Sequence, residues 1–168
     1  EESVIEDDIY DSLRLIVIKR AKLRAMHLLS DMGRTESQLR TKLKQGGYAE
    51  DAVEAAIRYV KSFGYINDME YARSFIDSRK ERKSKKELYA ALLQKGVPAE
   101  IVEQVFEEAD YGEQDSRQAI EALMRKRNYN PDSADLKEKQ KLMGYLMRKG
   151  FRYEDVNSVL NSADSDIW

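Results

Sequence analysis

The sequence predicts an all-α protein made of three tandem three-helix repeats. Three observations predict this fold. Proline and glycine number only two and eight in 168 residues, whereas Lys, Glu, Arg, Ala and Leu, which favour helix, are abundant. Apolar residues recur at helical spacing through most of the chain. One pattern of apolar residues and a glycine also occurs three times with the same offsets, which is typical of repeat proteins.

The repeated pattern starts at a leucine in each copy. Further apolar residues or glycine follow at offsets 4, 8, 9, 14, 17, 18 and 21. The three copies are Leu39, Leu43, Gly47, Tyr48, Val53, Ala56, Ile57 and Val60; Leu88, Leu92, Gly96, Val97, Val102, Val105, Phe106 and Ala109; and Leu142, Leu146, Gly150, Phe151, Val156, Val159, Leu160 and Ala163. Each copy therefore predicts a helix, a tight turn at a left-handed glycine, and a second helix with an apolar stripe.

A third helix precedes each pair. Its apolar stripes are Ala25, Leu28, Leu29 and Met32 in the first copy, Ala72, Phe75 and Ile76 in the second, and Ile120, Leu123 and Met124 in the third. We interpret these stripes as core packing of a three-helix bundle. Ile9, Leu13, Ile16 and Val17 keep helical spacing upstream, so the first helix is expected to begin early. Residues 15–18 could instead form a short strand.

Local signals mark where several helices begin. The pairs Thr35/Gln38 and Ser84/Glu87 have the spacing of capping boxes. Pro98 suits a first helical position. Residues 128–132 are expected to form an inserted loop in the third copy. We therefore expect a helical lead-in and three repeats, at residues 1–20, 21–66, 67–113 and 114–168.

The composition argues against catalysis. The chain has one histidine and no cysteine, which removes disulfides, thiolate metal sites and most nucleophilic triads. His27 lies between two apolar residues, and we expect it to be an ordinary, partly exposed helix residue. The acidic clusters at residues 6–8 and 164–166 lack the spacing of a calcium loop. We predict no catalytic residue, no metal and no cofactor, and a protein that works by binding.

Nothing in the sequence indicates a membrane protein. The apolar stretch at residues 15–18, like every other in the sequence, is far short of the roughly 20 residues that a spanning helix needs. Because cysteine is absent and no signal peptide is visible, we expect a cytoplasmic protein. Position 1 is Glu rather than Met, so we expect a trimmed N-terminus and an upstream segment outside this sequence.

Charge is unevenly distributed although the net charge is only −2. Six of the eight residues from 79 to 86 are basic: Arg79, Lys80, Arg82, Lys83, Lys85 and Lys86. The third copy adds Lys137, Lys139, Lys141, Arg148 and Lys149, and the first adds Arg40, Lys42 and Lys44. In contrast, the last helix of the second copy carries Glu100, Glu103, Glu107, Glu108 and Asp110, with no basic residue.

These charges bear on two interpretations. A helix, glycine turn and helix suggests a DNA-binding helix-turn-helix, but an acidic second helix would be repelled by phosphates, and only Arg58 and Lys61 of the first copy would suit that role. The basic run can be simply a solvated surface. However, Lys85 and Lys86 would lie at a helix N-terminus, where the dipole disfavours each cation by ~0.3–1 kcal/mol. An anionic partner would offset this penalty.

One stretch and its continuation resemble a known family. Gly64, Tyr65, Ile66, Asn67 and Asp68 are followed by Tyr71 and Ala72, Phe75 and Ile76, and Arg79. Together with Glu87–Leu88 and Lys95–Gly96–Val97, they resemble the RecX family of bacterial recombination regulators from about residue 21 to 160. One departure is the basic stretch at residues 82–86, where many members have a glycine-containing turn.

The resemblance implies an elongated, curved array of three repeats and a partner. That partner is the RecA recombinase filament on single-stranded DNA, whose ATP hydrolysis and strand exchange such proteins limit in recombination and DNA repair. The resemblance and the charges together suggest a monomer that contacts the filament through the basic residues of the second and third copies, the second contributing most, with single-stranded DNA as a weaker partner. Direct binding to nucleic acid is the main alternative, and a scaffold for an unrelated protein is a third.

Overall fold

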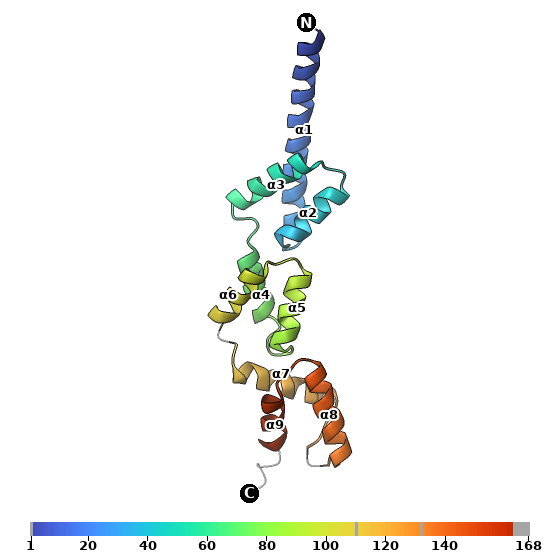
Figure 1. Cartoon of the computed structure of the whole chain (residues 1–168), viewed down its shortest axis with the longest axis vertical. Helices are drawn as coiled ribbons and strands as arrows, with labels where there is room; N and C mark the ends of the chain where they lie inside the picture. Colours follow the sequence, from blue (N-terminus) through green and yellow to red (C-terminus); the bar gives the residue numbers. More distant parts are fainter. Residues whose placement is uncertain (1, 110, 132, 163–168) are drawn as a thin grey trace. The chain divides into compact units, whose positions relative to one another are not determined.

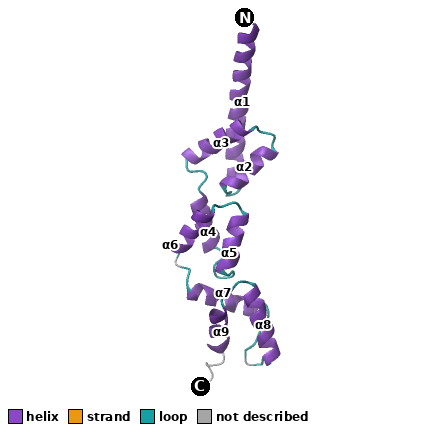
Figure 2. Cartoon of the chain, in the orientation of Figure 1, coloured by secondary structure: helices purple, strands orange, loops and turns teal. Residues whose placement is uncertain are grey.

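The computed structural model describes residues 2–109, 111–131 and 133–162, and within these ranges all regular structure is α-helical (Figures 1 and 2). The helices are α1 (Glu2–Asp31), α2 (Glu36–Gln45), α3 (Glu50–Ser62), α4 (Asp68–Asp77), α5 (Lys85–Gln94), α6 (Ala99–Glu108), α7 (Glu113–Lys126), α8 (Leu136–Arg148) and α9 (Tyr153–Ser162). The predicted series of three helix triplets is confirmed. The alternative strand at residues 15–18 is wrong, because this segment lies inside α1.

The chain divides into two compact units. Unit 1 holds the described residues up to Tyr71 together with Lys95–Val97, and unit 2 holds Ala72–Gln94 and the described residues from Pro98 onward. None of the described helices is both long enough and apolar enough to cross a membrane.

Unit 1 is organised around α1, α2 and α3. The C-terminal half of α1 packs against α3, which crosses it, and α2 contacts both (Figure 1). Its core consists mainly of Ala21, Ala25, Leu28, Leu39, Leu43, Ala52, Val53, Ala56, Ile57, Val60 and Ile66. Met32 was expected in this core but is 58% exposed, because α1 ends at Asp31 and Met32 lies beyond its last turn. The upstream apolar stripe, Ile9 to Val17, is helical as predicted, yet its side chains are exposed.

Unit 2 contains the other two triplets. The stripes of α4, α5 and α6 bury Ala72, Phe75, Ile76, Leu88, Leu92, Val102, Val105 and Phe106. A second core, formed by α7, α8 and α9, contains Ala119, Ile120, Met124, Leu142, Leu146, Phe151, Val156, Val159 and Leu160. Ala163, the last position of the repeated pattern, lies outside the described residues. The same apolar offsets thus produce similar cores in all three triplets.

The turn and capping predictions are largely confirmed. Gly47, Gly96 and Gly150 have φ angles of 83°, 79° and 92°, the left-handed region that ends a helix. Both predicted capping boxes form, at Thr35 and at Ser84.

One helix start differs from expectation, and a second was not predicted. Pro98 is the N-cap of α6 rather than its first helical residue, because its backbone is still extended, with ψ of 142°. The third copy has a capping box that the sequence analysis missed, Asp135 with Glu138, and α8 therefore begins earlier within the repeated pattern than α2 or α5 does. The signal was present as an aspartate followed three residues later by a glutamate.

Candidate functional site

The basic run lies at the junction between α4 and α5. Arg79, Lys80, Arg82 and Lys83 occupy the connecting loop, and Lys85 and Lys86 form the first turn of α5. Backbone hydrogen bonds hold the loop in tight turns: Lys80 N donates to Ile76 O at 2.8 Å, and Arg82 N donates to Arg79 O at 2.9 Å. The loop therefore closes without a glycine.

Part of this run is engaged in contacts within unit 2. The Arg79 guanidinium lies 4.2 Å from the centre of the Phe75 ring, a cation–π contact. Lys80 Nζ is 3.6 Å from Asp77 and 4.0 Å from Asp115. Lys85 Nζ lies 5.3 Å from the centre of the Phe106 ring. These three cations help to hold the loop and the start of α5 in place.

Arg82 and Lys83 line a hollow with residues distant in the sequence. The hollow has a volume of about 470 Å³ and is lined by Arg82, Lys83, Glu87, Ala122, Leu123, Lys126, Tyr145 and Lys149. Its walls come from the α4–α5 loop, α5, the second half of α7 and the end of α8. We call it the basic hollow, because four cations and a single carboxylate line it.

The carboxylate in the basic hollow is already paired. Lys149 Nζ donates to Glu87 Oε1 at 3.0 Å, and this hydrogen bond, with the charge of Glu87, raises the pKa of Lys149. At the wall, the Arg127 guanidinium lies 3.7 Å from the centre of the Tyr145 ring. With Glu87 matched by Lys149, the remaining cations that line the hollow leave an excess of positive charge beside an aromatic ring.

The basic surface continues along α8. Lys141, Tyr145 and Lys149 are spaced four residues apart and therefore share a helix face. Lys137 and Arg148 lie next to this face by the same spacing. Lys139 does not, because its Nζ donates to Asn161 Oδ1 on α9 at 3.2 Å.

The structure thus sorts the basic residues singled out from the sequence. Arg82, Lys83 and Lys149 meet in the hollow. Lys137, Lys141 and Arg148 lie on the adjoining part of α8 by their spacing, and Lys86 lies in the first turn of α5. Other contacts are made by Arg79, Lys80, Lys85 and Lys139. The sequence analysis missed Lys126, Arg127 and Tyr145. The basic stretch at the end of α7 was a visible signal for the first two, whereas nothing in the sequence marked Tyr145 as part of the same surface.

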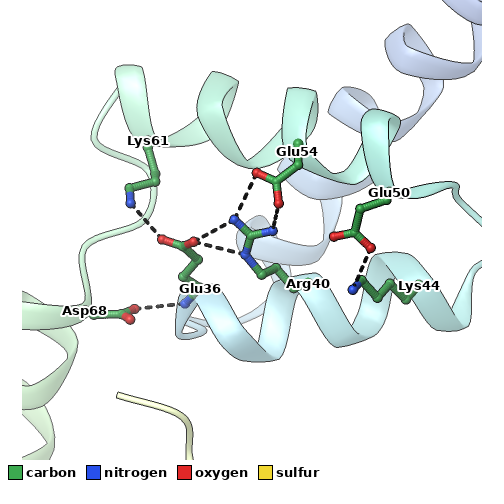
Figure 3. Close-up of polar contacts among 7 residues, drawn as sticks. All are labelled: Glu36, Arg40, Lys44, Glu50, Glu54, Lys61 and Asp68. Atoms are coloured by element: carbon green, nitrogen blue, oxygen red, sulfur yellow. Dashed lines mark hydrogen bonds and ion pairs between the residues drawn. The ribbon is translucent and has the colours of Figure 1, made fainter. Parts of the chain in front are cut away.

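In unit 1 two of the corresponding cations, Arg40 and Lys44, are paired with carboxylates (Figure 3). The Arg40 guanidinium is bound by both Glu36 and Glu54, which raises the pKa of Arg40. Partial burial raises the pKa of Glu36, but hydrogen bonds from Lys61, at 2.7 Å, and from Arg40 outweigh this and lower it. Lys44 pairs with Glu50 at 2.7 Å.

The residues of the family-like joint between the first two triplets form a turn, fill the core and cap a helix. Gly64 has a φ of 70°, and Ile66 is buried in the core of unit 1. Asn67 Oδ1 accepts hydrogen bonds from the backbone N–H groups of Met69 and Glu70, at 3.0 and 3.2 Å, and so caps α4.

Asp68 Oδ1 of the same joint accepts from Glu36 N at 2.8 Å, at the start of α2 (Figure 3). Burial raises the pKa of this carboxyl. Tyr71 N donates to Asn67 O at 3.0 Å, and the Tyr65 ring stacks on Phe63 with 5.7 Å between ring centres. The polar side chains of the joint therefore satisfy helix termini.

Neither α6 nor α9 resembles a DNA-reading helix. Glu100, Glu103, Glu107 and Glu108 are exposed on α6, which has no basic residue. Glu103 accepts from the Tyr89 hydroxyl at 3.2 Å, and Glu108 binds Arg73. Helix α9 likewise carries no cation. Asp110 and Asp164 lie outside the described residues. Among the described residues, no group of three or more potential metal ligands gathers.

Comparison with known proteins places three family models along the chain. They are described as the first, second and third three-helix domains of RecX and match residues 21–59, 67–105 and 113–160. A "Regulatory protein RecX" from Caldanaerobacter subterraneus is 35% identical over 147 residues, which cover 87% of this chain and 72% of that protein. A protein of the same name from Clostridium perfringens (strain SM101) is 29% identical, with coverage of 84% and 67%.

Two solved structures have the same fold. RecX from Lactobacillus salivarius aligns with a TM-score of 0.72, covering 89% of this chain and 98% of its own. Another crystal structure of regulatory protein RecX aligns with a TM-score of 0.77, covering 93% of this chain and 77% of its own. Both are 21% identical to this chain, so they establish the likeness of fold alone.

Proposed function

This chain belongs to the RecX family of regulatory proteins, and we propose that it binds the RecA recombinase filament on single-stranded DNA and limits ATP hydrolysis and strand exchange. The proposal combines a family whose named members are regulatory proteins with a surface suited to an anionic partner. It describes a non-catalytic, cytoplasmic protein that acts as a monomer.

The basic hollow is the observation that carries this proposal. Among the described residues that line it, Glu87 is the one carboxylate and is bound to Lys149, which leaves Arg82, Lys83 and Lys126 for a partner. Charge of one sign in a concave surface raises the local concentration of oppositely charged partners and speeds their association. A filament that carries DNA offers both phosphates and protein carboxylates, and either would match this surface.

Three similar triplets would add to the strength of binding. A partner that repeats along a filament can contact more than one triplet, so that several weak contacts act together. The paired cations of unit 1 indicate that such contacts would differ in chemistry between the two units.

RecA-catalysed ATP hydrolysis on single-stranded DNA tests the proposal. Steady-state hydrolysis should fall when the chain is added in stoichiometric amounts, and it should recover with a variant whose basic hollow carries reversed charge. Unchanged hydrolysis in the presence of the wild-type chain would contradict the proposal.

A second candidate function is direct binding to single-stranded nucleic acid. The observation that favours it is the Tyr145 ring, with Arg127 stacked on it, beside the cations of the hollow. Aromatic rings next to a basic groove are typical of proteins that bind single strands. Fluorescence anisotropy of a labelled oligonucleotide, without RecA, tests it: tight binding that weakens steeply with salt is expected, and no binding would leave only protein partners.

A further inference from the structure

One polar contact occurs twice in the molecule, at equivalent positions of successive triplets. The Thr35 hydroxyl, at the start of α2, donates to the carbonyl of Lys95 at 2.6 Å. The Ser84 hydroxyl, at the start of α5, donates to the carbonyl of Lys149 at 2.6 Å. Each acceptor is the residue immediately before a turn glycine. In the part of the chain that the structure describes, Thr35 and Ser84 are the only buried polar or charged side chains.

Each hydroxyl makes two hydrogen bonds, of which a carboxylate cap could make only one. The oxygen accepts from the N–H of the helix residue three positions on, at 3.2 Å for Gln38 and 3.1 Å for Glu87, while the proton goes to the carbonyl. An ionised aspartate could accept but not donate. In the third copy the equivalent position, four residues before Leu142, is Glu138, and the cap has moved to Asp135.

The glycine that follows each acceptor carbonyl is close to the same helix start. A Cβ atom on Gly96 would come within 2.4 Å of Ser37 Cβ, and one on Gly150 within 2.8 Å of Lys86 Cβ. Gly47, which occupies the same position of the first copy, has open space there. Hydroxyl, carbonyl and glycine therefore form one joint, which we call the hydroxyl joint.

The joint at Ser84 has features that bear on the basic hollow. Glu87, its capping-box partner, also holds Lys149 Nζ at 3.0 Å. The Tyr111 hydroxyl donates to the carbonyl of Lys83 at 2.7 Å, immediately before Ser84. Lys83 and Lys149 both line the hollow. The joint at Thr35 has Gln38 in place of Glu87.

We propose that Ser84 is a positioning residue of the basic hollow: its hydroxyl fixes the end of α8 and, with Glu87 and Tyr111, sets Lys149 and Lys83 in place for an anionic partner. This inference rests on the proposed function. A site whose cations are held in advance loses less conformational entropy when its partner binds. Removing the hydroxyl releases the cations without removing any charge.

The two joints provide a matched test. Ser84→Ala and Thr35→Ala each remove one buried cap hydroxyl, and thermal unfolding followed by circular dichroism should show similar losses. Binding to RecA filaments on single-stranded DNA should separate them. We expect Ser84→Ala to weaken binding by about two- to tenfold beyond Thr35→Ala, the range that one net hydrogen bond covers. Ser84→Thr, which keeps the hydroxyl, should restore binding.

Two further variants distinguish an error in the proposed surface from an error in the positioning role of Ser84. The double charge reversal Lys83→Glu with Lys126→Glu tests the hollow itself: if it binds filaments normally, the proposed surface is wrong. If it loses binding while folded Ser84→Ala binds like Thr35→Ala, the positioning role alone is overturned. If Ser84→Ala does not fold, Tyr111→Phe replaces it, because this change removes only a hydroxyl. Unchanged binding by a folded Tyr111→Phe would then contradict the proposal.

Discussion

Units 1 and 2 use similar helix triplets but differ in how the basic residues at the helix starts and ends are paired. In unit 1, Arg40 is bound by two carboxylates, Lys44 pairs with Glu50 and Arg14 with Asp51. In unit 2, Arg82, Lys83 and Lys126 gather around a hollow whose one carboxylate is already bound. The repeated apolar pattern therefore fixes the core of each triplet and leaves the surface free to diverge. The comparison indicates that Arg40 and Lys44 of unit 1 are matched by carboxylates, whereas Arg82, Lys83 and Lys126 of unit 2 share a hollow whose carboxylate is bound to Lys149.

The largest expected effect tests the claim of equivalent cores. Leu43→Ala in unit 1 and Leu92→Ala in unit 2 remove the same position of the pattern, and both leucines are fully buried. Each change should cost ~2–5 kcal/mol of unfolding free energy, through lost burial and the cavity left behind. Urea denaturation followed by circular dichroism measures it. A cost below about 1 kcal/mol at either position would contradict the shared core design, since it falls outside the range for such deletions.

The turn glycines should show a graded effect. Alanine at Gly47 meets only the backbone penalty of a left-handed conformation, roughly 1–2 kcal/mol. Alanine at Gly150 meets the same penalty and also clashes with Lys86, and Gly96→Ala clashes with Ser37. Overpacking adds typically ~1–3 kcal/mol. Urea denaturation should therefore rank Gly47→Ala as the mildest of the three. Equal losses would mean that the close approach to the helix start is relieved without cost.

Charge reversal tests the difference between the two surfaces. Lys83→Glu with Lys126→Glu changes the hollow of unit 2, and Lys42→Glu with Arg58→Glu makes the same change in net charge at exposed positions of unit 1. The first pair should weaken filament binding by about tenfold or more and reduce its salt dependence, because opposed charges at a binding surface alter association. The second pair should have little effect on binding. Helicity should be unchanged in both, and equal losses of binding would contradict the division of roles.

The sequence predicted the core well because the core depends on local spacing. Offsets such as Leu88 to Leu92 and the glycine at offset 8 placed the helices and turns correctly, and the caps at Thr35 and Ser84 followed from their own neighbours. The starts of α6 and α8 were harder to predict, because more than one residue near each start can act as the cap. In the third copy the position equivalent to Thr35 and Ser84 is Glu138, and the cap at Asp135 starts α8 earlier in the pattern.

The candidate site was only partly predictable. The run of cations was visible, but which of them face a partner depends on neighbours brought in by folding. Asp115 lies beside Lys80, and Tyr145 and Lys126 reach the hollow from two other helices. No local pattern could reveal the hydrogen bond from Ser84 to Lys149, since 65 positions separate them. The boundaries at residues 20, 66 and 113 and the curved arrangement of repeats stay predictions.

The smallest expected effect is on stability at acidic pH, and it tests an ion pair of unit 1. A hydrogen bond from Arg40 lowers the pKa of Glu54 in the folded protein below its ordinary value of 4.5. The carboxylate therefore contributes stability that is fully present above about pH 4.5 and is lost as pH falls through the folded pKa. Burial raises the pKa of Asp68, so the contribution of this carboxyl to stability changes with pH in the opposite direction. The wild-type protein is therefore compared with Glu54→Gln, in which Asp68 is unchanged. Melting temperatures should differ most above pH 4.5 and converge as the pH falls below the folded pKa of Glu54, with a small difference overall because such exposed pairs are weak. A pH-independent difference would mean that Glu54 contributes by packing rather than by charge, and the contrast between internally paired and outward-facing cations would then rest on Lys61 and Lys44.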